Sequence, residues 1–391
     1  MGVVHETAAG GGQELRYAAA LSEQTDAAEA AAAVTTEILE RLGPEPELAV
    51  LFVTPPHRAA VDEIADAVRS VLRPGTLLGA AAVAVLGPRR EVEQTPGVSL
   101  FAARLGSPAI PVRLRAEDAS GGWRTSGLPS DVGTARSMLL VADPFTFPVD
   151  LLLAVIGRDH AGLTVVGGMA SAATGPGGNR LLVDGTWYAD GAVGALLAED
   201  VSADAVVSQG CRPIGRPYIV TRGEGHVIYE LGGRPALDRL VATLEHVSPA
   251  DRQLAEQGLH CGVVIDETKV EFERGDFLIR GVLGVDQGTG AVAVGDVVPV
   301  GSTVQFQVRD ATSADDDLHA VLTGRSAAGA LVFTCNGRGR RMFGTPDHDA
   351  TVVGDLLGTA AIAGMFCAGE FGPVGGRNAV HGFTASIAIF T

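Results

Sequence analysis

Short apolar segments alternate with longer amphipathic segments along this chain, and this alternation restricts its fold more than any other feature. Near the start, Ser22–Arg41 reads as a helix, with acidic residues early and an arginine last. The strand-like run Leu48–Val53 follows, and His57–Leu72 then carries apolar side chains at helical spacing. Leu77–Leu86 and Val98–Arg104 again resemble strands. This order predicts mixed α/β layers and argues against a helical bundle.

The chain is longer than one compact core normally supports. It has 391 residues, whereas single cores stop growing at about 250–300 residues. Strand-like runs become denser from Cys261 onward, so we place a boundary within Gly232–Arg252. We predict a flexible leader over residues 1–20, a first domain over 21–235 and a second over 236–391. The fold class should be α/β with mixed (α+β) sheets, each domain holding a mixed β-sheet with covering helices.

The excess of acidic residues restricts the partners of the protein. Lysine and arginine number 29 against 46 aspartates and glutamates, which gives a formal net charge of −17. Such a chain repels phosphate backbones, so we expect no nucleic-acid binding. No apolar run approaches the roughly 18 residues that a membrane-spanning helix needs, and no basic and then apolar leader is visible. We expect a cytoplasmic protein with no membrane partner.

Common cofactor, metal and nucleophile motifs are missing from the sequence. The single lysine, Lys269, lies in no phosphate-binding loop, and no GxSxG segment occurs. The cysteines are far apart without a CxxC pair, and no two histidines have HxxH spacing. A disulfide framework or a zinc site is therefore not expected. We predict neither a cofactor nor a metal.

Two cysteine motifs follow apolar strands in the last third of the chain. The first is Cys335–Gly339 (CNGRG) and the second is Cys367–Gly372 (CAGEFG). Glycines allow a ligand to approach the backbone closely, Asn336 adds an amide, and Arg338 could hold a carboxylate by two hydrogen bonds. We predict that these strand ends lie side by side and form a ligand site. The alternative is that both cysteines are small core residues.

Four further side chains are candidates for the same site, and each has a simpler alternative. Glu370 could bind a cationic group or only cap a tight turn. Arg309 ends a strand and could line a cleft or pair with an acid. His381 opens the last strand and could be a buried core residue. Arg212 lies in a proline-stiffened segment that could either point guanidinium groups into a cleft or brace a domain junction.

Several of these segments together resemble a known family. Gly210–Leu237 looks like the end of a FIST N domain, and Thr334–Gly339, Met365–Gly376 and His381–Phe390 look like parts of a FIST C domain. The C-terminal segments occur in the expected order, and the resemblance covers most of the chain. Its weakest stretch is Ser107–Val132, which we expect to be an irregular insertion.

The resemblance implies a sensory role. FIST domains are regarded as sensors of small ligands, with amino acids proposed, and they often accompany signalling modules. This chain shows no such module, so the resemblance implies signalling through a separate protein. Two other functions remain open on the residues: a thiol-dependent hydrolase or transferase using Cys335 or Cys367 with His381 as base, and a protein-binding scaffold.

Arg338 carries the most specific structural expectation. A guanidinium that is buried alone is costly, so Arg338 should pair with an anion. We expect that anion to be Glu370 in the empty protein and a ligand carboxylate in the occupied one, which would free Glu370 to bind an ammonium group.

Overall fold

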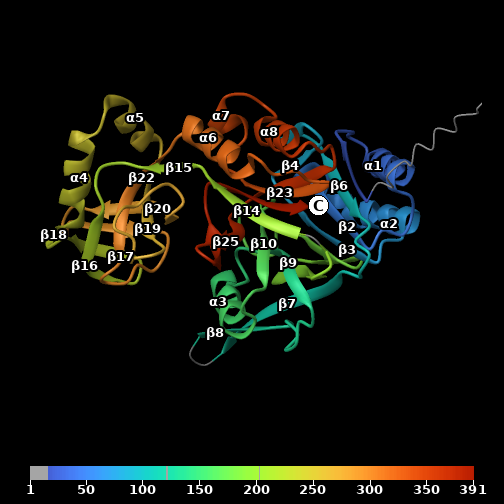
Figure 1. Ribbon diagram of the computed structural model, residues 1–391, viewed down its shortest axis with the longest axis horizontal. Helices are drawn as coiled ribbons and strands as arrows, with labels where there is room; N and C mark the ends of the chain where they lie inside the picture. The colour runs from blue at the N-terminus through green and yellow to red at the C-terminus, as the bar shows by residue number, and fades with distance from the viewer. Residues whose placement is uncertain (1–15, 120–121, 202) are drawn as a thin grey trace, which may run out of the picture.

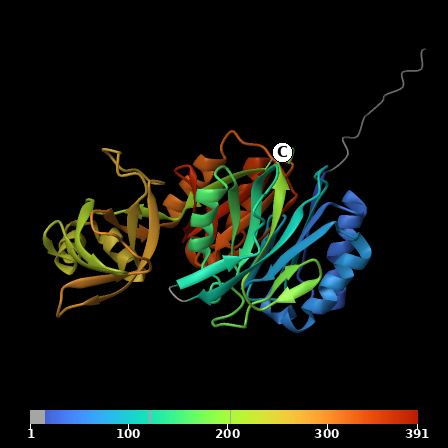
Figure 2. The same cartoon turned by 90° about the horizontal axis from the view of Figure 1, so that it is seen from below.

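The computed structural model describes residues 16–119, 122–201 and 203–391 (Figure 1). Four β-sheets with covering helices make up these residues, so the predicted mixed α/β class is confirmed. Three sheets and six α-helices form one part, here called the main body. The fourth sheet and two helices form a second part over residues 211–309, here called the outer unit. Figures 1 and 2 show the outer unit beside the main body.

The first sheet of the main body is covered on one face by two helices. Its strand order is β1-β6-β2-β3-β11-β12, and β2 runs parallel to β3. Helices α1 and α2 bury apolar residues such as Ile38 and Ile64 against this face. The bounds are β1 Tyr17–Ser22, α1 Ala27–Leu42, β2 Leu48–Val53, a 3-10 turn Pro55–Ala60, α2 Val61–Leu72, β3 Thr76–Ala81, β6 Val98–Ala103, β11 Leu181–Val183 and β12 Thr186–Tyr188.

The buried strand β1 corrects the predicted leader. Residues 1–15 lie outside the described residues, but Tyr17–Ser22 is a strand paired with β6 along its length. Its YAAALS sequence is short and rich in alanine, so it carries little strand signal of its own. Pairing with β6 and burial of Tyr17 against Phe101 and Phe390 hold it in place.

The second sheet has the strand order β26-β25-β10-β9-β13-β7-β8 and carries helix α3. Its outermost hairpin, β7–β8, lies within Ser107–Val132, so the expectation of an irregular insertion is wrong. The outer half of the hairpin is exposed, which weakens the apolar alternation that would have revealed it. The bounds are β7 Ile110–Ala119, β8 Gly122–Ser126, β9 Ala135–Ala142, α3 Val149–Asp159, β10 Thr164–Met169, β13 Ala192–Ala198, β25 Glu370–Val374 and β26 Arg377–His381.

The third sheet combines strands from both ends of the chain in the order β14-β27-β23-β24-β4-β5. Strand β4 belongs here while β3 belongs to the first sheet, so the run Leu77–Leu86 is two strands rather than one. Both strands are buried throughout, so no polar residue marks the break. The bounds are β4 Ala84–Gly87, β5 Arg90–Glu93, β14 Ala203–Gln209, α6 Ala311–Leu322, β23 Gly329–Cys335, α7 Arg340–Phe343, α8 His348–Leu357, β24 Ile362–Cys367 and β27 Thr384–Phe390.

A single apolar core joins the three sheets of the main body. It contains Phe52 and Phe101 from the first sheet, Leu139 from the second, and Phe333 and Phe390 from the third. The ring of Phe52 meets that of Phe333 edge to face at 6.0 Å between centroids. The early and late parts of the chain therefore fold around the same core.

The outer unit is an eight-stranded sheet with its own core. The chain enters it after Gly210 and leaves it before Asp310, and β16 and β17 form an antiparallel hairpin within it. Strand β17 also pairs with β21, so this sheet extends across the predicted boundary at residues 235 and 236. The bounds are β15 Cys211–Pro213, β16 Tyr218–Glu224, β17 Val227–Leu231, β18 Arg234–Pro235, α4 Ala236–His246, α5 Pro249–Gln257, β19 Leu259–Val264, β20 Phe277–Asp286, β21 Ala291–Val294 and β22 Thr303–Arg309.

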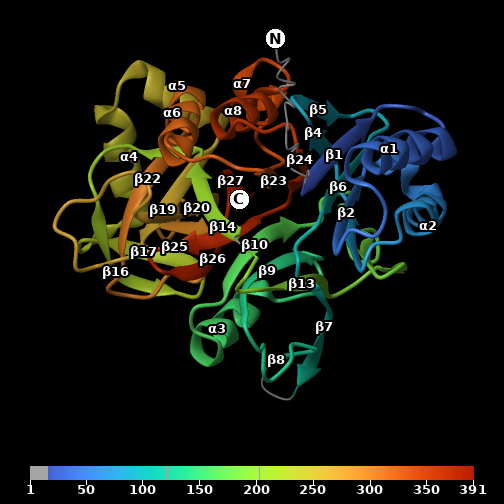
Figure 3. The ribbon, with the colours of Figure 1, turned by 45° about the vertical axis from the view of Figure 1, so that its right-hand side comes forward.

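The outer unit meets the main body along β20 and β26, which lie against each other (Figure 3). Among the described residues, no helix is both long and apolar enough to cross a membrane.

Candidate functional site

The two cysteine motifs meet where β23 and β24 end. These strands are parallel neighbours in the third sheet, and Cys335 is in register with Cys367. The backbone N–H of Asn336 donates to the Cys367 carbonyl oxygen at 2.8 Å. Glu370 then begins β25 and pairs with His381 at the end of β26. The prediction that the two strand ends lie side by side is therefore confirmed.

A cavity of about 400 Å³ opens at these strand ends, between the main body and the outer unit. From the main body it is lined by three of the predicted site residues, Cys335, Asn336 and His381. From the outer unit it is lined by β20 and by Asp296. We call this cavity the cleft. Its remaining walls include the backbone of Gly281, Gly295, Gly369 and Gly382.

An ion pair stands in the cleft at the contact between the two parts of the molecule. The Nε of Arg280 bonds to the Asp296 carboxylate at 2.7 Å, and Nη1 donates to the Val380 carbonyl oxygen at 3.1 Å. A second cavity of about 350 Å³ shares Asp150, Arg280, Asp296 and Val380 with the cleft. The two cavities therefore adjoin at this ion pair.

Arg338 lies behind the cleft wall and pairs with Asp349 rather than with Glu370. Its Nε and Nη2 each bond to an Asp349 oxygen at 2.8 Å, and both side chains are fully buried. The expected Arg338–Glu370 ion pair is therefore wrong. Asp349 lies in the first turn of α8, which turns its carboxylate toward the end of β23. Thr334 also donates to this carboxylate at 2.6 Å.

The pKa of Asp349 reflects this environment. Burial by itself would raise that pKa, but the Arg338 guanidinium overrides it and holds the pKa below its usual value. His348 extends the network toward the surface, with its ring nitrogens 2.9 Å from Asp349 and 3.0 Å from Asp315. Arg338 thus fixes α8 against β23 from inside the main body.

Glu370 is fully buried and does not line the cleft. Its Oε2 accepts from the Thr384 backbone N–H at 3.2 Å and from the Thr384 hydroxyl at 2.7 Å. Among the described residues, its Oε1 has no hydrogen-bond partner. Burial raises the pKa of Glu370 to about 8, although the Thr384 bonds and the Arg338 charge act in the other direction. Near neutral pH this carboxyl group is therefore protonated.

The two cysteines differ in position but not in protonation. Cys335 lies at the cleft wall, where its sulfur accepts from the Gly337 backbone N–H at 3.4 Å. Cys367 packs inside against Gly168, where an added Cβ would come within 2.4 Å of the sulfur. Burial raises the pKa of both thiols. Because only the thiolate is nucleophilic, this environment gives the thiol-enzyme hypothesis no support.

His381 is a neutral side chain of the cleft. Its Nε2 lies 3.1 Å from the Gly372 carbonyl oxygen, and burial lowers its pKa to about 4. The Nε2 proton is thus engaged by the backbone, and no hydrogen bond joins His381 to either cysteine among the described residues.

The other two predicted arginines lie away from the cleft. Arg309 stacks over the Phe383 ring at 5.1 Å and donates to the Gln257 carbonyl oxygen at 3.1 Å. Arg212 binds Asp251 and Asp310, so it braces the point where the chain leaves the outer unit. Of the two alternatives for Arg212, this geometry favours the structural one.

Comparison with known proteins identifies the family. The model for the FIST N domain matches residues 47–234, and the model for the FIST C domain matches residues 236–373. The chain belongs to the FIST family. An uncharacterized protein of Mycobacterium tuberculosis is 45% identical over 386 residues, covering 96% of this chain and 100% of the relative. An uncharacterized protein of Mycobacterium bovis is 44% identical over 385 residues, covering 96% and 99%.

The FIST assignment confirms the resemblance on which the sensory hypothesis rests. FIST domains are associated with signal transduction and small-ligand sensing. The FIST C match contains Cys335, Asn336, Arg338, Cys367 and Glu370 but ends before His381. In this FIST protein the cleft therefore combines matched residues with the strand that follows them.

Three charged side chains of the cleft were not found by sequence reasoning: Asp150, Arg280 and Asp296. Asp150 begins a helix, where an acid has an ordinary structural role. Arg280 lies within β20 and Asp296 follows β21, and the two form no sequence motif. Only the approach of the outer unit to the main body brings the three together, and that approach carries no local sequence signal.

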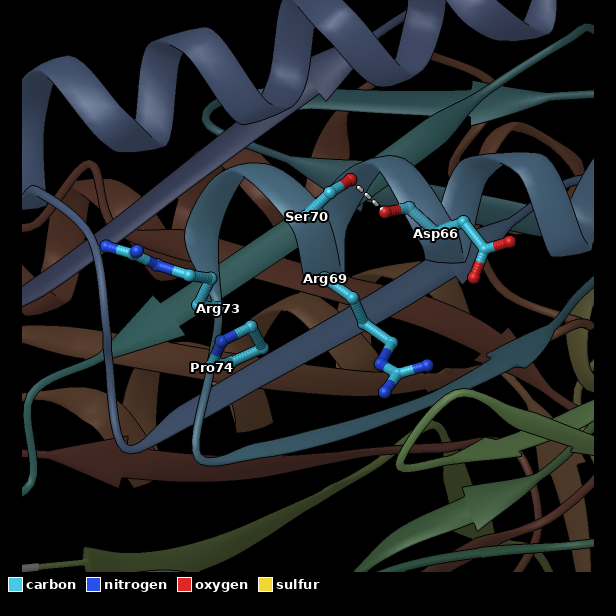
Figure 4. A pocket seen from close by; sticks show the side chains of 5 residues that line it. All are labelled: Asp66, Arg69, Ser70, Arg73 and Pro74. Carbon is cyan, nitrogen blue, oxygen red and sulfur yellow. Dashed lines mark hydrogen bonds between the residues drawn. The ribbon is translucent and has the colours of Figure 1, made fainter.

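A larger hollow on the outer side of α2 has a different character. It has a volume of about 550 Å³ and is lined by Asp66, Arg69, Ser70, Arg73 and Pro74. Figure 4 shows its two arginines pointing apart, while Ser70 bonds back to its own helix. It contains none of the predicted site residues, so we assign the candidate site to the cleft.

Proposed function

We propose that this FIST protein binds a small ligand in the cleft and passes the occupied state to a separate signalling partner. Amino acids or similar zwitterions are the proposed ligand class. The cleft offers both charge signs for such a molecule, with Arg280 for a carboxylate and Asp150 with Asp296 for an ammonium group.

The observation that carries this proposal is the convergence of separate chain segments on one cavity. Asn336 follows β23, His381 ends β26, and Arg280 lies on β20 of the other part of the molecule. Concave sites with a few converging polar groups, lying between parts of a protein, are typical of small-molecule binding. The glycines in the wall add backbone groups that a ligand can approach closely.

The buried candidates have supporting roles in this proposal. Arg338 holds the loop that presents Asn336, because its bonds to Asp349 tie that loop to α8. Glu370 supports the wall behind Cys335, because its hydrogen bonds to Thr384 hold β25 and β27 together there. Arg309 and Arg212 support the junction of the outer unit. Asn336, Cys335 and His381 are the predicted residues proposed to touch the ligand.

A thermal-shift screen of metabolites, with amino acids first, tests the proposal. A ligand present at about 100 times its dissociation constant stabilises the folded protein by about 2.7 kcal/mol, which raises the melting temperature measurably. Hits are then repeated with Asn336→Ala, which removes one polar group of the cleft. A hit whose shift is lost in this variant supports the proposed site. If no small molecule shifts the melting temperature of the wild-type protein, the proposed function is wrong.

A further inference from the structure

The hydrogen-bonding state of His381 restricts what the cleft can recognise. A carbonyl oxygen only accepts hydrogen bonds, so the Nε2 that faces the Gly372 oxygen at 3.1 Å must carry the ring proton. In a neutral imidazole, Nδ1 is then an acceptor. Among the described residues nothing donates to it, although the side chain is only 3% exposed and lines the cleft. This acceptor is therefore available to a donor from a ligand in the cleft.

The charges that face the cleft favour a cationic donor. Asp150 and Asp296 are the acids in its wall, and Arg280 is the only arginine or lysine among its lining residues. Arg280 is already engaged by Asp296 and by the Val380 carbonyl oxygen. Asp150 receives no hydrogen bond from another side chain among the described residues. The wall therefore holds one carboxylate more than its own cation balances.

Asp150 shows the electrostatic consequence of this imbalance. Burial raises its pKa, and repulsion from Asp296 raises it further, while Arg280 lowers it only in part. An added positive charge beside Asp150 would relieve both effects. Its position in the wall shared by the two cavities makes it reachable from either one.

The adjoining cavity extends the space available to such a ligand. It continues past the Arg280–Asp296 pair and shares Asp150 with the cleft. Arg377 lies in its far wall and donates to the Ile265 carbonyl oxygen at 2.8 Å. A short, extended molecule can therefore occupy the cleft while one end lies beside Asp150.

We infer that the cleft recognises a primary amine, with His381 Nδ1 as an acceptor for its N–H groups and Asp150 with Asp296 as its countercharge. This inference rests on the proposed function and deepens it. A ligand carboxylate becomes dispensable, whereas a ligand ammonium group becomes essential.

A series of three four-carbon probes separates these requirements. Putrescine has two ammonium groups, γ-aminobutyrate has one ammonium and one carboxylate, and succinate has two carboxylates. Titration calorimetry on the full chain should give the order putrescine, γ-aminobutyrate, succinate from tightest to weakest. Succinate that binds as tightly as putrescine, or putrescine that does not bind at all, would overturn the inference.

Substitutions then test whether Asp150 contributes to ligand binding. Asp150→Asn keeps the shape of the side chain and removes its charge, so it should weaken putrescine binding by about tenfold, as expected for a lost charged hydrogen bond. Asp159→Asn is the matched control, because Asp159 lies on the same helix but bonds only Arg158 and lines neither cavity. Equal putrescine affinity in the two variants would contradict the inference.

Nitrogen-15 NMR of histidine provides a readout that does not depend on substitution. The Nδ1 resonance of His381 should have the shift of an unpaired acceptor in the free protein and should move when putrescine binds. An Nδ1 resonance that stays unchanged at saturation removes His381 from the site and overturns the inference as stated.

This inference and the proposed function fail in different ways. If the metabolite screen yields a ligand that needs Asn336 but the probe series ranks succinate first, the cleft is a ligand site and the amine inference is wrong. If the screen yields no ligand and no probe binds, both are wrong.

Discussion

Two arginine–aspartate pairs stand on either side of the cleft wall, and they differ in what surrounds them. Arg338 and Asp349 are fully buried in the main body and are joined by two parallel hydrogen bonds. Arg280 and Asp296 lie at the contact with the outer unit, where the Asp296 side chain is 40% exposed. A buried pair cannot exchange partners without leaving a bare charge, whereas a pair whose carboxylate is partly exposed can. The first pair is suited to structure and the second to recognition.

The largest expected effect comes from breaking the buried Arg338–Asp349 pair. Arg338→Ala leaves the Asp349 carboxylate buried without its cation, so it should lower the free energy of unfolding by about 3–5 kcal/mol. Urea denaturation of the wild type and the variant measures this difference. A loss below 1 kcal/mol would mean that Arg338 does not hold α8 against β23, and the structural role assigned to it would be wrong.

A medium effect on stability is expected from the titration of Glu370, whose carboxyl group lies near this pair. Burial raises the pKa of Glu370 to about 8, above its ordinary value of about 4.3 in the unfolded chain. Between these values the folded state holds a proton that the unfolded state has released, so stability falls as the pH rises toward 8. The slope from this group should approach about 1.4 kcal/mol per pH unit at most.

Urea denaturation between pH 5 and pH 9 tests the assignment, with Glu370→Gln as the comparison. The variant should have a shallower decline, because glutamine does not titrate. Burial also raises the pKa of Glu91 to about 8, with a contribution from Asp349, so part of the decline should remain. Identical slopes in the two proteins would show that Glu370 is ionised in the folded state.

The smallest expected effect comes from breaking the Arg280–Asp296 pair. Arg280→Ala removes a partly exposed ion pair and should cost about 1 kcal/mol or less in the free energy of unfolding. It should nevertheless change the affinity for any ligand of the cleft. Urea denaturation and calorimetry on the same preparation separate the two. A stability loss as large as that of Arg338→Ala would erase the distinction between the pairs.

The predicted part of the site and the unpredicted part have different physical origins. Cys335 and Cys367 could be placed together because apolar strands with glycine-rich exits are visible in the sequence and neighbouring strands bring their ends together. Asp349 could not be found, because its PDHDA surroundings look like an exposed helix start. Its pairing with Arg338 depends on how α8 packs on the third sheet.

The fold likewise contains elements that the sequence predicts and strand pairings that it does not. The amphipathic helix α2 was predicted from the run His57–Leu72, because its signal is local. The joining of β4 to β24 pairs residues far apart in the chain, and the outer unit closes through pairing of β17 with β21. Local propensity does not report such long-range pairing.

Blocking the cleft tests the central claim most directly. Gly281 lines the cleft and Gly284 lies outside it on the same strand β20, and an added Cβ meets nothing within 4 Å at either position. Calorimetry with the best hit of the metabolite screen compares Gly281→Leu with Gly284→Leu. We predict that Gly281→Leu abolishes binding while Gly284→Leu retains wild-type affinity, with both variants folded. Wild-type affinity in Gly281→Leu would contradict the account.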